Sequence, residues 1–154
     1  MSRWMAALAL LVFLISACRP SGSTGLPPEP TGPAVVLRDV LHADGVHGRL
    51  RFELELVPPA PQPGDLFEVL TTVRDVRTGE QRAVAVAVDA TMPHHGHGMA
   101  TKPVHEPLED GRVRTRGMKL HMPGRWLLMV TSEEDGAEWV VELPHRRPVA
   151  PPGG

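Results

Sequence analysis

Hydrophobic and polar positions alternate over several short segments of this chain. The clearest is residues 50–56, where leucine or phenylalanine at the even positions alternates with arginine or glutamate at the odd ones. A period of two points successive side chains to opposite faces, so the pattern predicts a half-buried antiparallel β-strand. Similar alternation or short apolar runs predict further strands over residues 35–40, 66–76, 83–91, 112–122, 126–130 and 139–143.

The fold predicted from these segments is all-β. No segment of ten or more residues shows the 3.6-residue period of an amphipathic helix. Six or seven short strands, separated by turns such as Pro123-Gly124, predict an antiparallel β-sandwich of about seven strands with an immunoglobulin-like architecture. Strict alternation along 112–122 would place Val113, Thr115 and His121 on one face, with Met118 on the other.

The N-terminal segment resembles a bacterial lipoprotein signal. Arg3 precedes an apolar run over residues 4–15, which is shorter than the ~20 residues of a membrane-spanning helix. Small residues then come directly before Cys18, as in a lipobox, and this resemblance implies cleavage before Cys18 and its lipidation. An ordinary signal peptide with a chance cysteine is the alternative. Arg19, where some bacteria use aspartate to retain lipoproteins in the inner membrane, favours the outer membrane.

Composition divides the remainder into three parts. Residues 1–17 are the predicted signal peptide, and residues 18–34, rich in Pro, Gly, Ser and Thr, predict a tether. Residues 35–144 have the length of one domain, and residues 145–154 predict a disordered tail. The net charge of −2 with no basic stripe excludes nucleic acid as an expected partner. We therefore expect a lipid-anchored envelope protein that faces the periplasm.

Histidine and methionine are concentrated in one part of the predicted domain. Residues 92–99 read Met-Pro-His-His-Gly-His-Gly-Met, and residues 118–122 read Met-Lys-Leu-His-Met. Thioether sulfur and imidazole nitrogen are soft to borderline donors that together suit copper, Cu(I) above all. The single cysteine, if acylated, leaves no thiolate for a metal and no disulfide.

The spacing of these residues predicts a His/Met copper site. His95 and His97 are two positions apart and share one side of an extended backbone, and Met99 continues the same alternation. Zinc rarely takes methionine as a ligand. The predicted ligands are His95, His97, Met99 and His121. Further possible ligands are Met92, His94, His105, Met118 and Met122.

Structural explanations for the same residues stay open. Met92, Met118 and Met122 can fill gaps in a core, as methionine commonly does. The His/Gly stretch can be an exposed loop, and His105, between Pro103 and Pro107, can be a loop residue. The chain has no Gly-x-Ser-x-Gly motif and no evident nucleophile beside a base, so we do not expect an enzyme.

The two His/Met stretches together resemble the YtkA-like domain, a small immunoglobulin-like module of bacterial envelope proteins grouped with FixH-like proteins. The similarity covers roughly residues 50–143 and rests on the 92–99 stretch and on His-Met-Pro-Gly-Arg-Trp at 121–126. FixH-like proteins usually have a membrane-spanning helix where this chain has its lipobox. The resemblance implies copper handling, as a chaperone, buffer or resistance component, with a copper donor or acceptor protein as partner. The alternative is a metal-free protein–protein interaction module.

Overall fold

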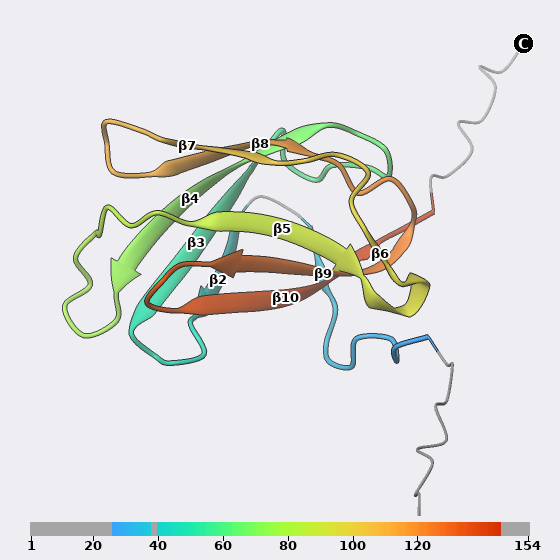
Figure 1. Cartoon of the computed structure of the whole chain (residues 1–154), viewed down its shortest axis with the longest axis horizontal. Coiled ribbons are helices and arrows are strands. Elements are labelled where there is room, and N and C mark those ends of the chain that lie inside the picture. The colour runs from blue at the N-terminus through green and yellow to red at the C-terminus, as the bar shows by residue number, and fades with distance from the viewer. Residues whose placement is uncertain (1–25, 38–39, 146–154) are drawn as a thin grey trace, which may run out of the picture.

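The computed structural model describes residues 26–37 and 40–145, and these residues form a two-layered β-sandwich (Figure 1). One sheet contains, in spatial order, β1 (Val35–Val36), β10 (Gly136–Leu143), β9 (Gly124–Thr131), β5 (Ala87–Met92) and β6 (His97–Gly98). The other contains β2 (Val40–Asp44), β3 (Leu50–Val57), β4 (Phe67–Asp75), β8 (Val113–Met118) and β7 (Val104–Pro107). The described residues include no α-helix, and thus no helix long and apolar enough to cross a membrane.

The connectivity is immunoglobulin-like. The neighbours β3, β4, β8 and β7 occupy the places of strands A, B, E and D, while β5, β9 and β10 occupy those of C, F and G. All neighbouring strands are antiparallel except β1, which pairs in parallel with β10. The predicted all-β sandwich is confirmed. The structure has more strands than the seven expected, because the short strands β1, β2 and β6 lie beside the seven that match the immunoglobulin-like order.

Four predicted strands are confirmed with their alternating burial. In β3 the even positions are buried and the odd ones are exposed or half-buried, and in β4 the odd positions from Phe67 to Val73 are buried. Strands β9 and β10 bury Trp126, Leu128 and Val130 and, opposite them, alternate residues up to Leu143. Period-two patterning found these strands because each has one face on the core.

Three other segments differ from the prediction. The apolar run at 35–40 is not one strand, because β1 pairs in one sheet and β2, which continues to Asp44, pairs in the other. Strand β5 begins at Ala87 rather than at residue 83, since the preceding residues lack a ladder partner. Strand β7 was not predicted, because Pro103 before it and Pro107 at its end are typical of a loop. It lies at the edge of its sheet, where proline is tolerated.

Strand β8 contains an extra residue that changes which side chains enter the core. Val69 of β4 pairs with Thr115, whereas Phe67 pairs with Met118, so two residues of β8 lie opposite one of β4. Gly117, in this β-bulge, has a φ of 81°, which glycine adopts without a steric penalty.

The bulge corrects the predicted facing of β8. Thr115 before it is buried, and so are Met118 and Leu120 after it, which strict alternation had placed on the opposite face from Thr115. The inward face therefore moves from odd to even residue numbers at Gly117. Met118 becomes a core residue with no exposed surface.

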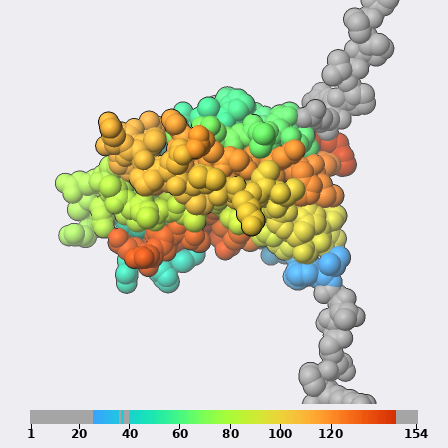
Figure 2. All heavy atoms as spheres, turned by 45° about the horizontal axis from the view of Figure 1, so that its top comes forward, coloured from blue at the N-terminus to red at the C-terminus, as the bar shows by residue number. Residues whose placement is uncertain are grey.

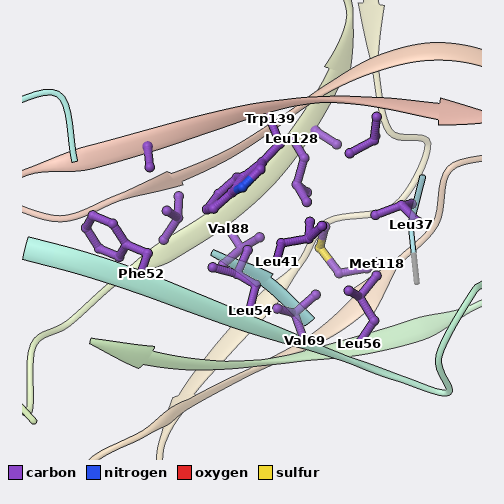
Figure 3. Close-up of a cluster of buried hydrophobic side chains, with 14 of the residues drawn as sticks. Leu37, Leu41, Phe52, Leu54, Leu56, Val69, Val88, Met118, Leu128 and Trp139 are labelled. Atoms are coloured by element: carbon purple, nitrogen blue, oxygen red, sulfur yellow. The ribbon is translucent and has the colours of Figure 1, made fainter. Parts of the chain in front are cut away.

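The core fills the space between the sheets (Figure 3). Apolar side chains from both sheets meet there, and burial of each large one contributes about 1.5–3 kcal/mol. The residues that meet are Val88, Leu128 and Trp139 from one sheet, with Leu54, Val69 and Met118 from the other.

A buried carboxylate joins the turn between β2 and β3 to the turn between β9 and β10. Asp135 is only 4% exposed. Its oxygens accept backbone N–H groups of His47 and Arg49, each at 2.9 Å, and of Leu50 at 3.2 Å. A Cβ at Gly45 would overlap this carboxylate, so glycine is needed there. In the sequence, residues 133–136 have the composition of an acidic turn, which does not indicate that the Asp135 side chain is buried.

Burial by itself would raise the pKa of Asp135, but the backbone N–H groups outweigh it and lower the pKa to about 2. A carboxylate with a lowered pKa in the folded state stabilises that state above its unfolded pKa of 3.8, and the contribution is lost as the pH falls toward about 2.

We predict that Asp135→Ala lowers the free energy of unfolding at neutral pH by about 3 kcal/mol, because buried N–H groups lose their acceptor. Urea unfolding measures this, with Glu133→Ala in the same turn as the control. The difference between the wild type and the Asp135 variant should shrink between pH 3.8 and about 2. A difference that stays constant over that range contradicts the assignment.

Candidate metal site

The His/Met loop leaves β5 and returns along it. After Met92, residues Pro93–His95 form one turn of 3-10 helix, and Gly96 closes it with a φ of 69°. Strand β6 then pairs with β5, with His97 opposite Met92. The Thr91 hydroxyl donates to the His97 carbonyl at 3.1 Å. Pro93 and Gly96 thus lie in the turn that connects β5 and β6.

The turn changes the expected relation between His95 and His97. The prediction assumed extended backbone, but His95 belongs to the 3-10 turn and only His97 lies in a strand. The two rings are nevertheless neighbours, with centroids 5.8 Å apart. Gly96, in the left-handed conformation, lies between them and turns the chain.

The second His/Met stretch brings His121 to the same place. The His97 and His121 ring centroids are 5.2 Å apart. This distance is shorter than the 5.8 Å between the centroids of His97 and His95. At the other end of the loop, His94 lies 5.6 Å from His95. Two pieces of chain more than twenty residues apart therefore supply one continuous row of imidazoles. The row comprises His94, His95, His97 and His121.

Trp126 supports the inner pair of this row. Its indole has no exposed surface, and its ring centroid lies 6.0 Å from that of His97 and 5.3 Å from that of His121, edge to face in both cases. The indole Nε1 donates to the Met122 carbonyl at 3.1 Å. This hydrogen bond ties the backbone beside His121 to β9.

The surroundings of the Nδ1 atoms differ between His97 and His121, the inner pair of the row. His97 Nδ1 lies 3.0 Å from the Gly98 carbonyl, which can only accept, so Nδ1 carries a proton, and in the neutral ring Nε2 is the nitrogen with the lone pair. His121 Nδ1 is buried without a hydrogen-bond partner. A second-shell carbonyl that fixes the tautomer of a histidine is common at metal sites. A buried ring nitrogen without a partner is costly unless something else binds it.

The methionines divide into two groups. Met92 and Met118 are buried in the core, and the Met92 methyl lies against Gly124, where an added Cβ would be 2.9 Å from it. Met99 and Met122 are only partly buried. The Met99 sulfur accepts the backbone N–H of Lys119 at 3.4 Å, so it lies beside the segment that leads to His121.

His105 lies apart from this row. It belongs to β7 in the other sheet, and its Nδ1 lies 3.0 Å from the Thr115 hydroxyl. None of the ring contacts recorded in the described residues involves it. The structure therefore brings together the rings of His94, His95, His97 and His121, and it places Met99 beside the segment that leads to His121. His105 lies apart from them.

In the observed side-chain conformations, the described histidine and carboxylate side chains do not supply three ligands for one metal ion. Within residues 26–37 and 40–145 there is no group of three or more His, Cys, Asp or Glu side chains with suitable spacing. Any ion shared by His97 and His121 would need a sulfur ligand or a rotated His95. Cys18 lies outside the described residues, so its predicted lipidation is not addressed by the structure.

The surface around the site includes the first described residues. Figure 2 shows the yellow His/Met loop beside the blue segment that begins at Leu26. A Cβ on Gly96 would lie 3.4 Å from Leu26 Cδ2, and Arg125 Nη2 donates to the Gly32 carbonyl at 2.6 Å. Part of the predicted tether thus lies against the domain next to the site.

Comparison of the chain with family models, with curated proteins and with solved structures gives no match. The YtkA-like resemblance therefore stays a prediction that rests on the residues quoted for it.

We predict that Trp126→Phe lowers the free energy of unfolding by about 1–2 kcal/mol, because the Met122 carbonyl loses its donor. The same change should move the imidazole NMR signals of His121. Trp139→Phe is the matched control, since its indole donates at 3.3 Å to the His42 carbonyl, away from the site. If the His121 signals stay in place in Trp126→Phe, this indole does not position the His121 loop.

Proposed function

We propose that this protein binds copper(I) reversibly through His97, His121 and Met99, and that it serves in the cell envelope as a copper chaperone, buffer or resistance component. The observation that carries the proposal is the inner imidazole pair. Two rings from different segments lie 5.2 Å apart, with the Nδ1 atom of His121 buried and unpartnered.

The donor types favour the reduced ion. The described residues contain no group of three or more His, Cys, Asp or Glu side chains that could hold a metal, and the Met99 thioether lies beside the segment that leads to His121. Thioether sulfur selects Cu(I), whereas Zn²⁺ prefers thiolate and imidazole. The sulfur of the half-buried Met99 accepts the backbone N–H of Lys119, two residues before His121, and this contact makes Met99 the proposed sulfur ligand.

The N-terminal segment relates this site to a membrane anchor. Leu26, which lies against Gly96, follows Cys18 by eight residues, so the two can be at most about 29 Å apart. If Cys18 carries a lipid, the candidate site stays close to the membrane surface. This arrangement suits exchange of copper with a donor or acceptor protein of the envelope.

We predict that the His97→Ala/His121→Ala double variant binds Cu(I) more than about 100-fold more weakly than the wild type, because both nitrogen ligands are lost. Competition with the chromophoric chelator bicinchoninate measures the dissociation constant. His105→Ala is the control and should bind normally. Equal binding by the wild type and the double variant would remove the proposal and favour a metal-free interaction module.

We further predict that Met99→Leu weakens Cu(I) binding at least about tenfold but leaves Cu(II) binding within about twofold, because only the soft ion depends on the thioether. Leucine conserves the volume and the packing of Met99. Met129→Leu, on β9 outside the His/Met stretches, is the matched control. Equal losses for both oxidation states would show that residue 99 acts through packing instead.

A further inference from the structure

The four imidazoles of the candidate site form a graded row from solvent to the interior. His94 and His95 are exposed, His97 and His121 are half-buried, and the Nδ1 atom of His121 has no solvent contact. Successive ring centroids are separated by 5.6, 5.8 and 5.2 Å. Exposure therefore falls along the row while the spacing stays nearly constant.

We propose that His94 and His95 are a capture pair that passes copper(I) inward, rather than permanent ligands of the bound ion. The inference rests on the proposed function, and it assigns the exposed half of the row a kinetic role. The ion is the cargo, received from a donor protein or a small chelator and delivered to the pair His97 and His121.

The contacts of the outer rings differ from those of the inner pair. Among the described residues, His94 has a ring contact with His95 but none with His97 or His121, whereas His97 and His121 contact each other and the buried indole. His94 and His95 sit on a one-turn 3-10 helix without buried residues, so their side chains can rotate at little cost in packing. His97 is held by its bonds to β5 and to Gly98.

Each transfer step is a ligand exchange that balances. The lone pair of an incoming neutral imidazole forms a Cu–N bond, and one Cu–N or Cu–S bond to the outgoing ligand breaks. No electron moves and copper remains Cu(I). Each ring has a neighbour whose centroid lies less than 6 Å away, so the incoming ligand is close to the outgoing one at every step.

A capture pair changes the rates of Cu(I) uptake and release but not the dissociation constant of the bound ion. Groups that bind the ion only in passing lower the barrier for uptake and for release equally, so they do not change the dissociation constant. Removal of the capture pair should therefore slow both directions by the same factor. Stationary ligands behave differently, because their loss weakens binding at equilibrium.

The test compares the full chain with its His94→Ala/His95→Ala variant. Stopped-flow absorbance follows transfer of Cu(I) from its bicinchoninate complex to the protein, and an equilibrium titration gives the dissociation constant. We expect the transfer rate constant to fall about tenfold, in the range by which association rates vary among variants of one site. The dissociation constant should stay within about threefold of the wild type. His42→Ala/His47→Ala, another exposed histidine pair, should change neither.

The outcomes separate the two proposals. A dissociation constant raised tenfold or more would make His94 or His95 a resting ligand and overturn the capture role. An unchanged transfer rate would overturn it as well. If the wild-type chain itself takes no Cu(I) from the chelator, the proposed function fails first, and the capture role fails with it.

Discussion

The burial of Trp126 at one end of the core is the interaction on which the candidate site depends. Its indole lies edge to face with both His97 and His121, and its N–H binds the carbonyl of Met122. A large apolar ring without exposed surface can be accommodated there only if the two histidine segments close over it. The core of the sandwich thus determines where the two imidazoles meet, although neither belongs to the core itself.

Much of the fold could be predicted from period-two patterning, and the exceptions have identifiable physical causes. Strands with one face on the core, such as β3 and β9, alternate plainly in sequence and were found. Period-two patterning gave the wrong facing for the residues that follow Gly117 in the segment 112–122. A bulge inserts one residue and exchanges the two faces, and a lone glycine in a strand does not reveal whether it bulges. Asp135 is similar, since an acidic turn usually signals exposure and only tertiary contacts bury this one.

The site was predicted in part. The concentration of histidine and methionine marked the two stretches in the sequence, and the structure brings the His97 and His121 rings from these stretches to 5.2 Å between centroids. Trp126 begins a segment that was predicted as a strand, but its contact with both imidazoles could not be inferred, because that contact depends on how β9 packs against the His/Met loop. The separation of His105 from the others follows from β7 joining the opposite sheet, and that strand left no clear pattern in sequence.

The central claim is that nitrogen from two segments and sulfur from Met99 converge on one copper(I) ion at the end of the sandwich. X-ray absorption at the copper edge of the purified full chain, loaded with one equivalent of Cu(I), tests it most directly because it identifies the ligand atoms. The account predicts a mixed first shell of two imidazole nitrogens and one thioether sulfur, with the sulfur contribution lost in Met99→Leu. A shell of nitrogen and oxygen alone, identical in both proteins, would contradict it.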